Sequence, residues 1–171
     1  MGWIDMPRIL SSESREIPFR KRSVKGVDLF VVSSSIEVIA DEADDSAALD
    51  RETMGLMVGR VYRDDEGIYA VMHRTVTSDL VADATHVRFD SDSMDALIDS
   101  VDGMADDERI IGWYHSHLDY GVFMSETDVR TQHSIFGEGM GFALVIDPLR
   151  GEFAVFDNSE MPQKVRMIVM E

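Results

Sequence analysis

Two histidines separated by a single residue are the most informative chemical feature of the sequence. His115 and His117 lie in a stretch, 109–117, that is typical of a buried strand. Successive side chains of a strand point to opposite faces, so the two imidazoles are expected to face the same way, within reach of one ion. A pair of this kind also arises by chance in a chain with five histidines, so further ligands are needed to argue for a metal site.

Asp128 is the candidate for a third ligand. A catalytic zinc ion takes three protein ligands and keeps one position for water or substrate. Ten residues separate His117 from Asp128, enough for a loop to bring the start of a helix back over the end of the strand. Ser125 and Asp128 also have the spacing of a capping box, in which both residues close the first turn of a helix. The two interpretations are compatible, because a capped helix fixes the side chains of its first turn.

The absence of cysteine and the positions of the other histidines limit the kinds of metal or catalytic site that the chain can form. The chain has no cysteine, which excludes disulfides, thiolate zinc sites, iron–sulfur clusters and cysteine nucleophiles. Any metal must therefore be held by His, Asp or Glu. His73, His86 and His133 have no partner at metal-ligand spacing and are interpreted as structural or exposed. Ser116 lies between the two histidines, faces the other side of the strand, and is assigned to packing or to supporting hydrogen bonds.

Helices and strands are interleaved along the sequence, which predicts a single α/β domain. The turn at 63–67 and the one at 147–151 each favour a hairpin, so the sheet cannot be purely parallel. Ser33, Ser34 and Ser35 offer an N-cap for the first helix. Helices are expected over 36–43, 94–101 and 125–134, and strands over 27–32, 52–62, 68–76, 85–89, 109–117, 142–146, 152–156 and 165–169.

The charge of the chain excludes two classes of partner. The net charge is −17, divided into +3 on residues 1–26 and −20 on residues 27–171. An acidic body repels the phosphate backbone of nucleic acids and anionic membrane surfaces. The sequence lacks a secretion signal and any apolar run of about 18 residues, so a cytoplasmic protein is expected. Its many aspartates and three lysines are compatible with a salty cytosol.

The histidines and Asp128 form part of a longer pattern that resembles the JAMM (MPN-plus) zinc metalloproteases. Order and spacing agree across about residues 27–157. The stretches that carry the resemblance are Glu52-Thr53-Met54-Gly55-Leu56-Met57-Val58-Gly59, Trp113-Tyr114-His115-Ser116-His117, Ser125 with Asp128, and Val145-Ile146-Asp147-Pro148.

The resemblance implies a fold and a mechanism. The fold would be a curved mixed β-sheet flanked by helices, of the cytidine-deaminase-like architecture, with residues 1–26 as a polar basic extension and 27–171 as the catalytic domain. His115, His117 and Asp128 would hold one Zn²⁺ per chain. Glu52 would serve as general base and then general acid, and Ser125 would stabilise the oxyanion. The reaction would be hydrolysis of the isopeptide or peptide bond after the C-terminus of a ubiquitin-like modifier.

The compact size and Asp-rich composition are similar to prokaryotic, archaeal-type members of that family. The partner is expected to be a ubiquitin-like protein or its conjugates, and residues 77–89 to form the edge that receives its extended tail. Two alternatives stay open: a peptidase that trims the precursor of a sulfur-carrier or ubiquitin-like protein, and a non-catalytic MPN scaffold. Leu118 stands where the family commonly has proline, which loosens the turn after His117.

Overall fold

The computed structural model describes residues 17–77, 82–83 and 104–171. The predicted strand at 85–89 and the predicted helix at 94–101 lie outside these residues. In the described part of the chain, no helix is long and apolar enough to cross a membrane. The elements are β1 (Leu29–Val32), α1 (Ser33–Ala48), β2 (Arg51–Glu52), β3 (Met54–Asp64), β4 (Gly67–Thr77), β5 (Ala82–Asp83), β6 (Arg109–Ser116), α3 (Glu126–Phe136), β7 (Phe142–Asp147), β8 (Glu152–Phe156) and β9 (Met167–Met170).

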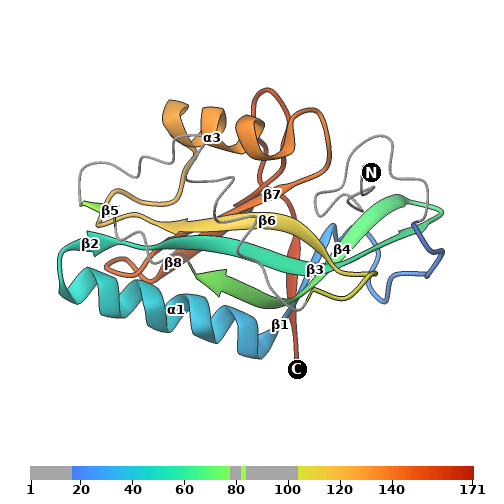
Figure 1. Ribbon diagram of the computed structural model, residues 1–171, viewed down its shortest axis with the longest axis horizontal. Coiled ribbons are helices and arrows are strands. Elements are labelled where there is room, and N and C mark those ends of the chain that lie inside the picture. The colour runs from blue at the N-terminus through green and yellow to red at the C-terminus, as the bar shows by residue number, and fades with distance from the viewer. Residues whose placement is uncertain (1–16, 78–81, 84–103) are drawn as a thin grey trace, which may run out of the picture.

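Seven strands form one mixed sheet in the order β8-β7-β6-β3-β4-β1-β9 (Figure 1). β3 is antiparallel to β4 and β6, whereas β6 runs parallel to β7 and β1 runs parallel to β4 and β9. After β8 the chain turns back, and the Val165 amide donates to the Val155 carbonyl at 2.9 Å before β9 begins at the other edge. The sheet is therefore curved and nearly closed, which confirms the predicted α/β class.

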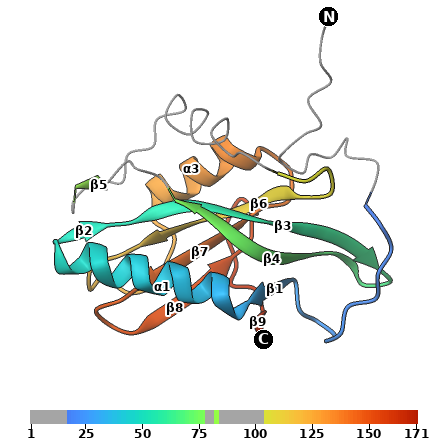
Figure 2. The ribbon, with the colours of Figure 1, turned by 60° about the horizontal axis from the view of Figure 1, so that its bottom comes forward.

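The two helices of the described part cover opposite faces of this sheet (Figures 1 and 2). Ile39 and Ala43 of α1 belong to the core cluster that includes Tyr114, whereas Ile135 and Phe136 of α3 belong to the cluster that includes Trp113. Neighbouring residues of β6 thus point to different helices. This alternation turns the side chain of residue 115, like that of residue 113, toward α3.

The N-cap predicted for the first helix is wrong. Val32 occupies the N-cap position of α1 and no side chain caps the helix. The strand pairing of β1 extends to Val32, which lies opposite Met170 of β9. The helix therefore begins directly at Ser33, and the serines fall within its first turn, where Ser35 is buried.

The predicted strand at 52–62 is present but interrupted near its start. Glu52 ends the short strand β2, which pairs with β5, and Met54 begins β3 in the large sheet. The glycines that follow are required by close packing. A Cβ at Gly55 would overlap the Tyr114 hydroxyl and the Val76 carbonyl, and one at Gly59 would overlap the Val71 carbonyl. Their spacing after Glu52 therefore reflects how tightly β4 and β6 flank β3.

The segment before β1 packs against the β3–β4 hairpin. The Arg22 guanidinium donates to both carboxylate oxygens of Asp64, each at 2.8 Å, and to the carbonyls of Val27 and Gly67. It also lies over the ring of Tyr69, 4.7 Å from the centroid. We call Arg22, Asp64 and Tyr69 the hairpin cluster. The division of the chain at residue 26 stays a prediction.

Candidate metal centre

The two histidines of the His-x-His pair lie at the end of β6, where the strand leaves the core. All eight residues of β6 are buried, and His115 is completely inaccessible to solvent. The ring of His115 stacks on that of Trp113, with centroids 4.4 Å apart, and lies 5.1 Å from the ring of His117. The structure thus places both imidazoles together, as the period of a strand predicts.

Asp128 reaches this pair from the first turn of α3. Its Oδ2 atom lies 3.1 Å from Nε2 of His115 and 3.5 Å from Nε2 of His117. The predicted capping box is confirmed: the Asp128 amide donates to the Ser125 hydroxyl at 3.1 Å, and the Ser125 amide donates to Asp128 Oδ2 at 2.9 Å. The cap therefore fixes the carboxylate beside the imidazoles, so both interpretations of this spacing apply.

The donor atoms fit a metal ion. One ligand atom from each of His115, His117 and Asp128 lies within 4.8 Å of the other two. Both ring nitrogens of His115 are buried: within the described residues Nδ1 has no hydrogen-bond partner, and Nε2 faces only the Asp128 carboxylate, 3.1 Å away, without the geometry of a hydrogen bond. A buried polar atom without a partner is costly, and a cation bound at Nε2 would satisfy it. Two imidazoles and a carboxylate are a ligand set that zinc uses in catalytic sites.

A hydrogen bond orients the ring of His117. Its Nδ1 atom lies 2.8 Å from the Gly121 carbonyl, which can only accept, so Nδ1 carries the hydrogen. The Nε2 lone pair of the neutral ring is then free to face Asp128 and a metal. Burial lowers the pKa of His117, but the carboxylates of Asp128 and Glu52 and the Gly121 carbonyl outweigh it, and the pKa is raised overall.

Electrostatics keep Asp128 charged. Burial by itself raises its pKa, but the neighbouring imidazoles of His115 and His117 and the Ser125 amide hold the pKa far below its usual range. A metal ligand must be deprotonated, so this carboxylate is ready to bind a cation at neutral pH.

Glu52 lies close enough to His117 for the two side chains to interact electrostatically, just before the β3–β6 pairing begins. Met54 pairs with His115. One residue closer to Glu52, the Ser116 amide donates a hydrogen bond to the Thr53 carbonyl at 3.0 Å. Glu52 is buried, with 7% of its surface exposed. Burial and the charge of Asp128 raise its pKa to about 7, although His117 lowers it. A carboxyl group with such a pKa can both accept and release a proton near neutral pH.

Other residues support this centre, and the sequence analysis did not single out Gln132. Ser116 accepts a hydrogen bond from the Thr53 amide at 2.7 Å, which agrees with the supporting role expected for it. Gln132, one turn after Asp128 on α3, accepts from the Trp113 indole at 2.9 Å. The i, i+4 spacing of Asp128 and Gln132 was the available signal. Asp147 was noted only as part of the family pattern.

The other described histidines have structural contacts. His73 lies 2.7 Å from the carboxylate of Glu108, and His133 lies 3.3 Å from the Ser159 carbonyl. Neither belongs to the group of possible metal ligands in the described part of the chain. His86 lies outside the described residues.

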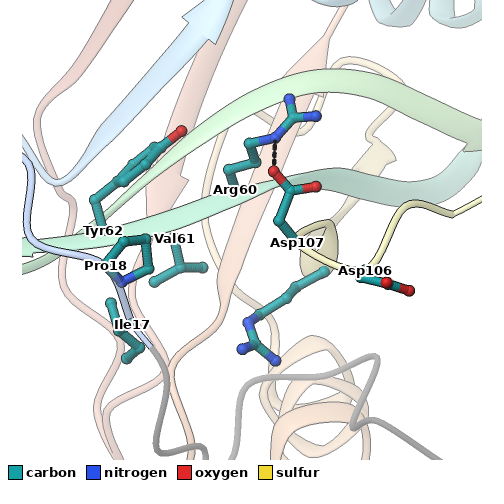
Figure 3. Close-up of a pocket in the computed structure, with 8 residues that line it drawn as sticks. Ile17, Pro18, Arg60, Val61, Tyr62, Asp106 and Asp107 are labelled. Carbon is teal, nitrogen blue, oxygen red and sulfur yellow. Dashed lines mark hydrogen bonds and ion pairs between the residues drawn. The ribbon is translucent and has the colours of Figure 1, made fainter.

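A cavity of about 560 Å³ lies elsewhere, near the hairpin end of β3 (Figure 3). Arg60 and Asp107, which line the cavity, form an ion pair with Arg60 Nε 2.6 Å from Asp107 Oδ2. None of the predicted site residues lines it. The residues that do are Ile17, Pro18, Arg60, Val61, Tyr62, Asp106, Asp107 and Arg109.

Comparison with known proteins identifies the family of this chain. The family model described as JAB1/Mov34/MPN/PAD-1 ubiquitin protease matches residues 25–137. The chain belongs to this family. The match includes all five predicted site residues, from Glu52 to Asp128, and it confirms the resemblance found in the sequence.

The relatives of this chain include a protein whose name describes a hydrolase and a subunit of a large complex. It is 32% identical over 125 residues to the Saccharomyces cerevisiae protein called ubiquitin carboxyl-terminal hydrolase RPN11, covering 70% of this chain and 39% of that protein. It is 32% identical over 106 residues to subunit 5 of the COP9 signalosome complex of Drosophila melanogaster, covering 58% and 30%. The chain spans less than two fifths of either relative. At a coarse level the relatives support a hydrolase.

A solved structure of a protein from Desulfitobacterium hafniense shares the fold. The TM-score is 0.54 at 19% sequence identity, with 84% of this chain and 93% of that chain covered. At this identity the likeness concerns the fold alone.

Proposed function

We propose that the chain is a zinc-dependent hydrolase that cleaves the isopeptide or peptide bond after the C-terminus of a ubiquitin-like modifier. The observation that carries the proposal is the buried group of His115, His117 and Asp128, in which His115 Nε2 faces only the Asp128 carboxylate among the described residues. The two imidazoles and the carboxylate together form a ligand set that fits a zinc ion. Membership of a ubiquitin protease family supports the choice of substrate class.

Three residues would hold the ion, Glu52 would transfer the proton, and Ser125 would stabilise the oxyanion. When bound, zinc supplies Lewis acidity, which makes water a competent nucleophile at neutral pH. Glu52 accepts a proton from the attacking water and delivers it to the leaving nitrogen. The water oxygen bonds to the carbonyl carbon, the carbon–nitrogen bond breaks, and the products are a carboxylic acid and an amine. A pKa of about 7 suits Glu52 to both transfers.

Ser125 is proposed to stabilise the charge that develops on the carbonyl oxygen. Its hydroxyl oxygen accepts from the Asp128 amide, which leaves the hydroxyl hydrogen for another acceptor. Its place at the N-terminus of α3 adds the positive end of the helix dipole. A donor fixed in advance in this way stabilises an oxyanion at little reorganisation cost.

A polypeptide substrate fits the surroundings of the centre. Exposed aromatic side chains border His117: Phe123, 4.9 Å from its ring, and Tyr120, 6.5 Å from it. Residues 82 and 83 form β5, and Ala82 lies opposite Glu52 in the β2–β5 pair. The proposal that residues 77–89 receive an extended tail is supported by this closeness to Glu52. The predicted strand at 85–89 lies outside the described residues.

A cleavage assay tests the proposal and separates its alternatives. The purified chain is loaded with zinc and incubated with ubiquitin-like modifiers joined to a lysine side chain or fused to a peptide. We expect cleavage that stops when the zinc is chelated and returns when zinc is added back. Cleavage of the peptide fusions alone would favour the trimming peptidase. A zinc-loaded chain that cleaves nothing in the panel would contradict the proposal and favour a scaffold.

A further inference from the structure

A buried carboxylate outside the ligand set is tied to the metal centre through a short loop. Asp147 ends β7 and is completely inaccessible to solvent. Its Oδ2 accepts from the Gly121 amide at 2.7 Å, and its Oδ1 accepts from the Asp119 amide at 3.1 Å. Burial raises the pKa of Asp147, but the amides that surround it outweigh this and keep it charged. The carboxylate therefore fixes two points of the loop that follows His117.

The loop has an unusual backbone course. Asp119 has φ = 68° and Gly121 has φ = 85°, so two of its residues are in the left-handed region. For a residue with a side chain, such as Asp119, this conformation is unfavourable. Leu118 also leaves the turn without the restriction on φ that a proline would provide. Gly121 adopts this conformation freely, and the hydrogen bond to Asp147 helps to hold Asp119 in it.

The anchored loop ends on the imidazole of His117. Gly121 donates its amide to Asp147 and accepts the Nδ1 hydrogen of His117 on its carbonyl, at 2.8 Å. The His117 amide is held by the Ile146 carbonyl at 2.8 Å, next to Asp147 in sequence. His115 has no comparable support, since its Nδ1 lacks a partner within the described residues. Any loosening of the loop should therefore act on His117 and spare His115.

From this chain of contacts we infer that Asp147 is a positioning residue: through Gly121 it fixes the His117 ring with Nε2 directed at the metal. The inference deepens the proposed function, because it rests on the same metal centre. Residues that orient metal ligands typically contribute about 10- to 100-fold to metal affinity. Asp147 would contribute in this way without contacting the ion or the substrate.

Zinc affinity of two matched variants tests the inference. Asp147→Asn keeps the side-chain shape but places an amide donor where an amide hydrogen must be accepted. Asp64→Asn is the control, because Asp64 is also buried and also accepts from a backbone amide, but belongs to the hairpin cluster. Affinities are measured by competition with a chromophoric chelator, after circular dichroism has shown that each variant is folded. We expect Asp147→Asn to weaken zinc binding about 10- to 100-fold and Asp64→Asn to leave it unchanged.

A second readout works on the metal-free protein. Nitrogen-15 NMR at a pH where the imidazole is neutral should show the hydrogen of His117 on Nδ1 in the wild type and a mixture of tautomers in Asp147→Asn. The inference is overturned if the folded Asp147→Asn variant binds zinc as tightly as the wild type. If that variant does not fold, wild-type NMR that places the hydrogen on Nε2 overturns it. A wild type that binds no zinc would contradict the proposed function instead, and the tautomer would still decide the role of Asp147.

Discussion

The metal centre and the hairpin cluster are both buried groups of charged side chains, and strand β3 runs from one to the other. Glu52 immediately precedes the β2–β3 junction, whereas Asp64 ends β3. In the hairpin cluster the Arg22 guanidinium makes four hydrogen bonds and both Asp64 oxygens accept. In the metal centre, within the described part of the chain, His115 Nδ1 has no hydrogen-bond partner and His115 Nε2 faces only the Asp128 carboxylate.

The difference separates a structural group from a functional one. Buried polar atoms are nearly always paired, so a cluster that satisfies itself has no capacity left for a ligand. The hairpin cluster is of this kind and ties residues 17–26 to the domain. In the metal centre, imidazole nitrogens of His115 and His117 face the charged carboxylate of Asp128. Without a cation this arrangement lowers the stability of the fold, because the buried nitrogens are not fully hydrogen-bonded.

The largest effect is expected on turnover, from Glu52→Gln. The variant keeps the shape of the side chain but cannot accept a proton from water, so kcat should fall by about 10²- to 10⁴-fold. Zinc affinity should stay close to that of the wild type, because Glu52 is not among the three ligands. Glu126→Gln is the control, an exposed acid in the first turn of α3. Steady-state kinetics on the zinc-loaded proteins measure kcat for both variants. Full turnover in Glu52→Gln would show that Glu52 is not the proton acceptor.

The largest loss of folding stability is expected from Arg22→Ala. It leaves the buried Asp64 charge without its guanidinium, and breaking one partner of a buried ion pair is strongly destabilising. Arg22→Lys should be intermediate, since an ammonium cannot form the two parallel hydrogen bonds. Urea unfolding of the metal-free proteins measures the effect. Zinc affinity of the folded variants should not change, and a parallel loss of zinc binding would show that the two clusters are not independent.

Next in size is a pH effect on the metal-free protein. Burial, with Asp128 nearby, raises the pKa of Glu52 from 4.5 to about 7, so the folded state binds its proton more tightly than the unfolded state. The stability that Glu52 contributes is therefore full below about pH 4.5 and declines as pH rises to about 7. Urea unfolding at several pH values should show a smaller decline in Glu52→Gln than in the wild type, the remainder coming from groups such as His117 whose pKa is also raised.

Glu108 provides a control of opposite sign. Burial raises its pKa, but the Ala105 amide, Arg74 and His73 outweigh burial and lower the pKa from 4.5 to about 2. Its stabilising contribution is therefore present above about pH 4.5 and lost as pH falls to about 2. Glu108→Gln should flatten the acid side of the profile and leave the region near pH 7 unchanged. The same response in both variants would contradict the assignment of these pKa shifts.

The smallest effect is expected from Arg150→Ala. Arg150 pairs with Asp119 at 3.0 Å, but the side chains are 46% and 68% exposed. An exposed ion pair contributes less than about 1 kcal/mol, so the free energy of unfolding should barely change. Zinc affinity should also fall much less than in Asp147→Asn. A loss as large as that of Asp147→Asn would mean that the exposed pair, rather than the buried carboxylate, holds the loop.

The sequence predicts the centre well where the decisive contacts are local or periodic. The alternation of a strand places His115 and His117 on one face, and the spacing of Ser125 and Asp128 predicts a capping box that the structure contains. Both the alternation of a strand and the spacing of a capping box depend only on residues that are close together in the sequence. The mixed sheet also follows from local signals, because each hairpin is marked by its own turn residues.

The parts that could not be predicted depend on backbone contacts between distant residues. Asp147 accepts from amides 26 and 28 positions away, and backbone amides have no signature in the sequence. Arg22 and Asp64 are 42 positions apart, and the sequence does not show which acid Arg22 meets. The N-cap at Ser33–Ser35 was wrong for a related reason, since pairing with β9 decides where β1 ends.

Zinc titration of the metal-free chain tests the central claim most directly. Isothermal calorimetry on the wild type should show one zinc bound per chain. His117→Ala should remain folded by circular dichroism and lose this binding, because only two ligands remain. A folded wild type that binds no zinc, or a His117→Ala variant that binds it as tightly as the wild type, would contradict the account.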